Sequence, residues 1–295
     1  MVALIVVVLC AAAALVLGLA FSAGRAQKQH IDDRKAEYRQ RILAITEPPE
    51  LPRFAKSGSL VVCLFEFRDT PETKSVMNAV ARVYGSDAES QGVGAAVVCG
   101  SANASVVRRA FAGWKNLMIV ELPVDNPGRR EYNALMKTPE VYELFSDSFS
   151  HMLVYQTDAV LFRKIPEVYF SYDYIGAPWA KGTRGAVQTP TPAGNGGFSL
   201  RRLSAIKRAC EANRGLGFRE ASSARGRELP EDVFFSSMKD FVYPDFWGEA
   251  HRAFSVESVY HKAPVGCHQP YLCAASRRQW KRFLARNFGL LMKVN

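Results

Sequence analysis

Three patterns are missing from this chain of 295 residues, and each absence narrows what the protein can be. The six cysteines include no C-x-x-C pair, so the ligand spacing of a zinc site is absent. Basic residues interleave with aromatic residues only near the C-terminus, which argues against nucleic acid as the partner. No glycine occurs in residues 65–71, directly after the first predicted strand, so the glycine-rich phosphate loop typical of nucleotidyltransferases is not present there.

Charge is also missing from the N-terminal segment. Residues 2–23 are almost wholly apolar and uncharged, and such a run is long enough to cross a bilayer as a helix. No basic residue precedes the run, which disfavours a cleaved signal peptide, so we predict a signal-anchor helix over residues 1–23 and a single-pass membrane protein. Basic residues follow the run instead, which favours a cytoplasmic domain, while a Golgi or endoplasmic-reticulum lumenal domain stays open.

The remaining chain predicts a single α/β domain. Residues 60–67, 95–99 and 117–121 are apolar enough for buried strands, and helical patterns separate them, which indicates a mostly parallel sheet flanked by helices. Hydrophobic residues make up 48% of the chain, which is enough for a full core. The net charge of +10 suits an anionic membrane surface or an anionic substrate such as a nucleoside diphosphate.

Charged and proline-rich stretches set the expected domain limits. We expect a stem over residues 24–58 and the globular domain over residues 59–275. Residues 276–295 form a basic amphipathic helix, which could lie on a membrane surface or dock on the domain with its charges in solvent. Of these two arrangements, docking is slightly favoured.

The candidate site starts at Asp158, which lies between two apolar runs, residues 152–155 and 159–162. A carboxylate in that place is costly to bury unless a cation meets it, so we expect Asp158 at the lip of the sheet. Gln156 and Asp158 are two residues apart, the spacing of the D-x-D pair with which many nucleotide-sugar transferases hold a divalent metal. An ordinary acidic turn at the end of a strand is the alternative.

Three further motifs follow in order along the chain. A glycine-rich turn covers residues 194–197, the pair Glu231 and Asp232 starts a predicted helix, and a Gly-x-His ends at His268. Each has a structural alternative: an ordinary turn, two carboxylates favoured at the positive end of a helix, and a histidine bonded to backbone. The motifs gain weight as an ordered set.

In this order the motifs resemble the GT-A glycosyltransferases, and most closely a family catalogued as domain of unknown function 5672 and regarded as glycosyltransferases of that fold. The resemblance covers roughly residues 59–271. It rests on Y-N at 132–133, Y-Q-T-D-A at 155–159, Y-I-G-A-P-W at 174–179, G-N-G-G-F-S-L-R at 194–201, P-E-D-V-F-F-S at 230–236, F-S-V-E at 254–257 and P-V-G-C-H-Q-P at 264–270. The E-D-V piece is also distantly similar to Fringe-like and β-1,3-galactosyltransferase enzymes.

The resemblance implies transfer of a sugar from a nucleotide-diphosphate sugar to a hydroxyl of a glycan, lipid or protein acceptor, with Mn or Mg bound and the anomeric carbon inverted. Asp158 would hold the metal, because oxygen ligands suit such hard cations, and His268 would be a further metal or phosphate ligand. Gln156 replaces the acidic first member of D-x-D, so metal affinity would be weak or would depend on bound nucleotide. Asp232 would be the general base, with Glu231 as the alternative.

Further contacts to the donor are expected from the ends of the predicted strands and from the glycine-rich turn. The donor-binding candidates are Arg68, Asn133, Gln156, Asp158, Trp179, Asn195, Gly196 and Gly197. Two other functions stay open: a nucleotidyltransferase that makes nucleotide sugars, and a non-catalytic sugar-binding or scaffold protein at a membrane. The sequence does not indicate the sugar, the acceptor or the oligomeric state.

Overall fold

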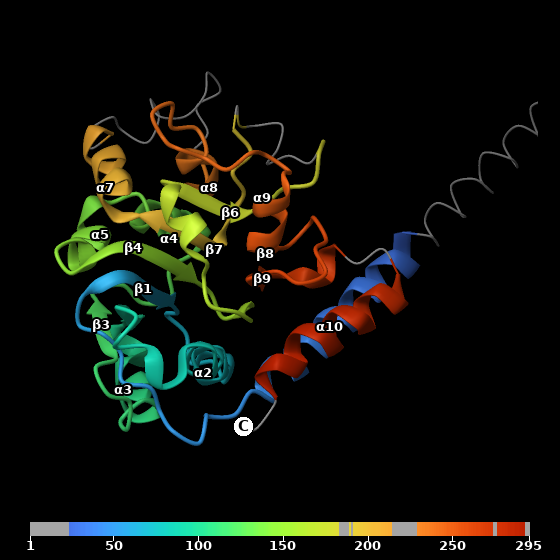
Figure 1. The fold of residues 1–295 in the computed structure, drawn as a ribbon, viewed down its shortest axis with the longest axis horizontal. Coiled ribbons are helices and arrows are strands. Elements are labelled where there is room, and N and C mark those ends of the chain that lie inside the picture. Colours follow the sequence, from blue (N-terminus) through green and yellow to red (C-terminus); the bar gives the residue numbers. More distant parts are fainter. Residues whose placement is uncertain (1–23, 183–188, 190, 214–228, 274–275, 293–295) are drawn as a thin grey trace, which may run out of the picture.

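The computed structural model describes residues 24–182, 189, 191–213, 229–273 and 276–292 (Figure 1). The predicted signal-anchor, residues 1–23, lies outside the described residues. Within the described ranges no helix combines the length and the apolar character needed to cross a bilayer.

A six-stranded sheet with the order β3-β2-β1-β4-β7-β6 forms the centre of the molecule. Its strands are β1 (Gly58–Phe65), β2 (Val93–Gly100), β3 (Met118–Leu122), β4 (Phe149–Tyr155), β6 (Tyr174–Ala177) and β7 (Asn195–Arg202). The first four are parallel, and Val62 of β1 is in register with Ala95 of β2 and Leu153 of β4. Strand β7 runs antiparallel to both β4 and β6. The predicted α/β class with a mostly parallel sheet is therefore confirmed, as a mixed sheet.

Helices cover both faces of this sheet. The helices and short helical turns are α2 (Glu72–Tyr84), η1 (Gly85–Asp87), α3 (Ser101–Ala110), α4 (Arg129–Leu135), α5 (Pro139–Ser146), η2 (Glu167–Ser171), α7 (Leu203–Ala212), α8 (Glu231–Phe235), α9 (Glu249–Phe254), η3 (Pro270–Leu272) and α10 (Arg277–Leu291). Successive residues of a strand point to opposite faces, so Val62 and Leu64 join the core under α2 and α3. Val61 and Cys63 join the core under α5 and α7, on the other face (Figure 1).

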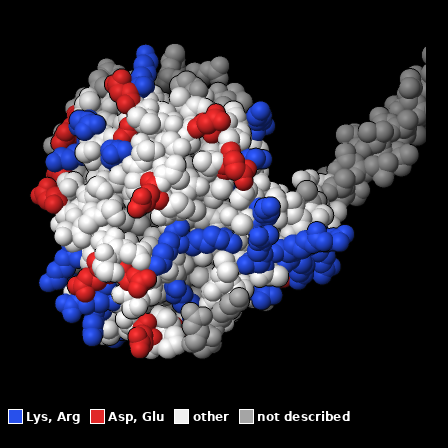
Figure 2. Space-filling view, in the orientation of Figure 1, with Lys and Arg blue, Asp and Glu red and all other residues white. Residues whose placement is uncertain are grey.

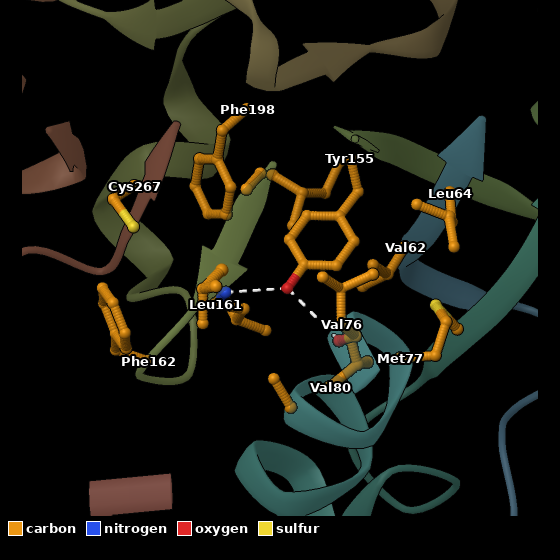
Figure 3. Close-up of a cluster of buried hydrophobic side chains, with 14 of the residues drawn as sticks. Val62, Leu64, Val76, Met77, Val80, Tyr155, Leu161, Phe162, Phe198 and Cys267 are labelled. Carbon is orange, nitrogen blue, oxygen red and sulfur yellow. Dashed lines mark hydrogen bonds between the residues drawn. The ribbon is translucent and has the colours of Figure 1, made fainter. Parts of the chain in front are cut away.

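The chain reversal after β4 is fixed by one buried hydroxyl. Tyr155 donates its phenolic hydrogen to the carbonyl oxygen of Val76 in α2 (3.3 Å) and accepts a hydrogen bond from the backbone N–H of Leu161 (2.9 Å), as Figure 3 shows. Leu161 ends β5 (Ala159–Leu161), which pairs in a second, three-stranded sheet with β9 (Gly266–His268), itself next to β8 (Ser255–Val256). Residues 156–158 are therefore held between two anchored strands.

The segment expected as a stem packs on the domain. Residues 24–43 form a helix, and Tyr38, Ile42 and Ile45 are buried in the same core as α2. The ring of Tyr38 lies 5.9 Å from the ring of Phe288 in α10. The prediction that the C-terminal helix docks on the domain is confirmed. Part of its docking surface is the helix over residues 24–43, which the sequence analysis assigned to the stem.

One predicted strand is only half formed. Residues 169–178 read as one strand in the sequence, but the first part is the helical turn η2 and only β6 pairs in the sheet. Within the turn, Tyr169 donates a hydrogen bond to the carbonyl oxygen of Ala250 in α9, and its ring packs on Phe254. These contacts lie outside the sheet, so Tyr169 is buried and hydrogen-bonded although it belongs to no strand.

Candidate functional site

A cavity of about 520 Å³ opens at the carboxyl ends of β1 and β4. The strand order reverses there, since β1 is followed in the chain by β2 on one side of it and β4 lies on the other side. In open α/β sheets ligands bind outside the carboxyl ends of the strands at such a reversal, and the volume is that of an ordinary ligand site. Arg68, Gln156 and Asp158 line the cavity, together with residues of the helix over 24–43.

A buried carboxylate organises the β1 side of the cavity. Glu66 is 3% exposed and receives hydrogen bonds from Arg68 Nε (2.7 Å) and Arg68 Nη2 (2.8 Å). The hydroxyl of Thr157 donates to the same carboxylate at 2.8 Å. Two of the five donors of the Arg68 guanidinium are thus used, and the rest of its half-exposed edge is available to a ligand in the cavity.

On the β4 side, Asp158 meets His268 because β5 pairs with β9 and brings Ala159 into register with His268. His268 Nε2 lies 3.3 Å from Asp158 Oδ1, and Nδ1 lies 3.4 Å from Glu257 Oε1. Burial opposes the ionisation of Asp158, but His268 and a hydrogen bond from Gln269 outweigh it and lower its pKa to about 2. Burial likewise opposes the charge on His268, and Asp158 and Glu257 raise its pKa to about 10.

The glycine-rich turn packs directly against this pair. A Cβ atom on Gly197 would lie 2.5 Å from the His268 ring and 2.7 Å from Gln156 Oε1, so no larger residue fits without a shift. Gln156 also donates a hydrogen bond to the hydroxyl of Tyr132 at 3.1 Å. The space beside Gly196 is filled by the Glu231 side chain. Both glycines therefore make room for neighbouring side chains of the protein: His268 and Gln156 at Gly197, and Glu231 at Gly196.

Asp232 lies next to this cluster, outside the lining of the cavity. Its Oδ2 is 3.4 Å from Asn195 Nδ2, and Asn195 Oδ1 accepts the backbone N–H of Gly197 at 2.7 Å. Burial, reinforced by the neighbouring carboxylate of Glu231, raises the pKa of Asp232 to about 7. A carboxyl group tuned to that range can exchange a proton near neutral pH.

Glu231 occupies a different environment from its neighbour. Its Oε2 accepts a hydrogen bond from Arg201 Nη2 at 2.7 Å, and the two side chains are 6% and 0% exposed. The guanidinium also lies 5.1 Å from the centre of the Phe235 ring and donates to the hydroxyl of Tyr142. Glu231 is the counter-ion of a buried arginine on β7, and this favours Asp232 over Glu231 as a candidate base.

The other donor-binding candidates are scattered. Asn133 accepts the backbone N–H of Glu231 at the start of α8 (3.3 Å), which is a capping contact. Trp179 is 8% exposed, and its carbonyl oxygen accepts the indole N–H of Trp247. Among the described residues, neither side chain lines the cavity. Sequence reasoning gave no role to Glu66 or Glu257, because a lone carboxylate in an apolar strand or loop has no distinguishing spacing.

The spacing of Asp158 and His268 is compatible with two ligands of one divalent metal ion. Nδ1 and Nε2 of His268 are buried and make no hydrogen bond, although carboxylate oxygens lie nearby. Neighbouring ligands of an octahedral ion with bonds of roughly 2.1 Å lie about 3 Å apart, which is close to the 3.3 Å between Asp158 Oδ1 and His268 Nε2. No cluster of three or more His, Cys, Asp or Glu side chains suited to a metal exists in the described part of the chain. The pair fits an ion only when His268 is neutral, so the ion would have to displace the proton that Asp158 and Glu257 favour on the ring, and its remaining ligands would come from elsewhere.

The fold and the cavity define an α/β protein with a cavity, partly lined by charged side chains, at the switch point of a mixed sheet. The sequence model of the family described as "Protein of unknown function (DUF5672)" matches residues 118–268, just over half of the chain, and the chain belongs to this family. The match includes Gln156, Asp158, Asp232 and His268. No curated protein matches the chain. The Fringe-like similarity stays a prediction.

Some solved structures are similar to the chain at a low level. One is the mannosyltransferase PcManGT from Pyrobaculum calidifontis in complex with GDP-Man and Mn²⁺, at 11% identity and a TM-score of 0.35, over 62% of this chain and 56% of that one. Another is S. aureus TarS 1–349, at 13% identity and a TM-score of 0.35, over 63% of this chain and 59% of that one. The chain therefore spans less than two thirds of either protein, and similarities this weak do not identify a function.

Proposed function

We propose that this protein is a glycosyltransferase that moves a sugar from a nucleotide-diphosphate sugar to an acceptor hydroxyl, with a divalent metal and with inversion. The observation that carries the proposal is the switch-point cavity. It presents Arg68 from the end of β1 and Asp158 from the end of β4. Asp232 lies outside the lining, hydrogen-bonded to Asn195, which in turn bonds the Gly197 backbone beside Gln156.

The charges around the cavity suit a diphosphate. Lys35 and Arg129 line it and form no ion pair within the described residues, and Arg68 has donors to spare beyond its pair with Glu66. Arginine and lysine are the usual partners of phosphate oxygens. An anionic ligand of nucleotide size would therefore gain three cationic contacts in this cavity.

Asp158 and His268 are the residues that would hold a Mn²⁺ or Mg²⁺ ion, which would neutralise charge on the departing diphosphate. Such ions are commonly bound by one or two protein ligands together with substrate phosphates. Two side chains are therefore sufficient when the nucleotide supplies further oxygens, and this matches the neutral Gln156 in place of an acidic residue.

Asp232 supplies the base. The acceptor oxygen forms a bond to the anomeric carbon as the bond from that carbon to the diphosphate oxygen breaks, and the acceptor proton passes to the Asp232 carboxylate. Attack from the face opposite the leaving group inverts the carbon. The hydrogen bond from Asn195 and the backbone N–H of Val233 (2.8 Å) orient the carboxylate for this role.

The test is a thermal-shift panel of nucleotide sugars on the full chain, with and without Mn²⁺, followed by a transfer assay on any donor that stabilises it. Asp158→Asn should lose the Mn²⁺-dependent shift, whereas Asp232→Asn should keep the shift and lose transfer. Asp240→Asn, at an exposed position, is the matched control and should behave like the wild type. The proposal fails if no nucleotide sugar stabilises the wild type, or if Asp158→Asn and Asp240→Asn behave alike.

A further inference from the structure

The exposed face of α10 is a ridge of positive charge. Arg278, Arg282 and Arg286 follow at four-residue intervals, so they emerge from one side of the helix about 6 Å apart. Arg277 and Lys281 lie beside them, all five are exposed, and α10 contains no acidic residue. In Figure 2, Lys and Arg side chains gather where α10 lies beside the N-terminal helix, with little acidic surface among them.

These charges are mostly not neutralised by the protein. Lys281 pairs with Glu37 at 2.6 Å, but Arg277, Arg278, Arg282 and Arg286 form no ion pair within the described part of the chain. Like charges four residues apart destabilise a helix, and Arg277 and Arg278 also lie at the positive end of the helix dipole. These repulsions destabilise α10 unless an anionic partner binds the ridge.

The apolar face of α10 is already used. Trp280, Phe283 and Phe288 are 1–2% exposed in the core shared with Tyr38, so this face is not free to enter a bilayer. Because these rings are buried, α10 also offers no aromatic surface on which nucleic-acid bases could stack. The ridge is therefore suited to an extended anionic surface that is bound by charge alone.

The position of the ridge on the molecule indicates which anionic surface it binds. Trp280 donates its indole N–H to Glu37 (2.9 Å), so α10 lies against the helix over residues 24–43. That helix follows directly after residues 2–23, which are apolar and carry no charge in the sequence. We propose that the basic ridge of α10, Arg277, Arg278, Lys281, Arg282 and Arg286, binds the anionic headgroups of a membrane surface.

Arginine footprinting of the full chain in lipid nanodiscs tests this. The chain is labelled with an arginine-specific dicarbonyl reagent, and each arginine is read by mass spectrometry. In nanodiscs that contain phosphatidylserine, labelling of Arg278, Arg282 and Arg286 should fall severalfold relative to phosphatidylcholine alone, and high salt should restore it. Arg53 and Arg108, whose side chains are 59% and 55% exposed, are internal controls and should not change.

A double variant sharpens the result. Removing two arginines near a lipid surface should weaken binding about fivefold for each, so in Arg278→Gln/Arg282→Gln the labelling of Arg286 should no longer depend on phosphatidylserine. An Arg53→Gln/Arg108→Gln variant is the matched control and should keep the dependence. Equal labelling of the ridge in both lipids overturns the proposal. Protection that persists in high salt, or protection by an RNA oligonucleotide but not by phosphatidylserine, overturns it as well.

Discussion

Replacing Glu231 by glutamine should destabilise the fold strongly, because Arg201 would remain as a buried cation without a counter-ion. The Arg201 side chain is 0% exposed, and its nearest carboxylate oxygen, Glu231 Oε2, lies at 2.7 Å. Its other hydrogen-bond partners, the hydroxyls of Tyr142 and Ser199 and the carbonyl oxygen of Gly196, are neutral. They can accept hydrogen bonds from the guanidinium, but they cannot balance its charge.

Breaking a buried ion pair on one side costs roughly 3–5 kcal/mol. The glutamine amide oxygen can still accept a hydrogen bond from Arg201, so the lower end, about 3 kcal/mol, is expected. With a urea m-value near 3 kcal/mol/M for a chain of this size, the midpoint of unfolding should fall by about 1 M. Equilibrium urea unfolding followed by tryptophan fluorescence measures this shift directly.

Asp232→Asn is the matched control, because it removes a carboxylate one residue away whose charged form burial disfavours. It should not lower the urea midpoint at pH 8. In addition, Arg201→Met combined with Glu231→Leu should recover much of the loss, since both charges leave the core together. A midpoint for Glu231→Gln within about 0.3 M of the wild type (roughly 1 kcal/mol), or an equal loss in Asp232→Asn, would refute the counter-ion role.

Three further outcomes are expected. The pKa of Asp232 is raised from 3.8 to about 7, so its contribution to stability is complete below pH 3.8 and declines as the pH rises towards 7. Urea unfolding of the wild type against Asp232→Asn should show this, with an upper limit of about 4 kcal/mol, and transfer should fall below pH 7 as the base is protonated. Gly197→Ala should weaken Mn²⁺-dependent donor binding by displacing His268, whereas Gly289→Ala, with nothing within 4 Å, should not. Lys35→Ala should weaken nucleotide binding in a salt-dependent way without changing the urea midpoint, since Lys35 is an exposed residue at the cavity.

The sheet could be predicted from the sequence because its strands are apolar on both faces. Residues such as Val61 and Val62 point to opposite cores, and only a strand covered on both sides needs both. The prediction of one strand over residues 169–178 is wrong in its first half, because apolar side chains can also be buried outside the sheet. Tyr169 is buried by α9 and not by the sheet, and a single sequence does not separate these two kinds of burial.

The site was predictable where spacing carried information. Asp158 marks the end of β4 in the sequence, and the Gly-x-His ending at His268 stood out as the last motif of an ordered set. Their separation of 3.3 Å arises from the pairing of β5 with β9, which nothing local to either motif indicates. Glu66 and Glu257 were missed because what distinguishes them is a partner from another element, Thr157 and His268 respectively.

The N-terminal helix shows why a composition shift is a poor guide to where a domain begins. Residues 24–43 are charged on most sides, so they read as a solvated stem, yet the single narrow stripe through Tyr38 and Ile42 enters the core. The Tyr38 hydroxyl donates to the carbonyl oxygen of Asp158 at 3.0 Å, and Lys35, three residues before Tyr38, lines the cavity. A helix that supplies both a core side chain and a wall of the cavity cannot be separated from the site without opening it.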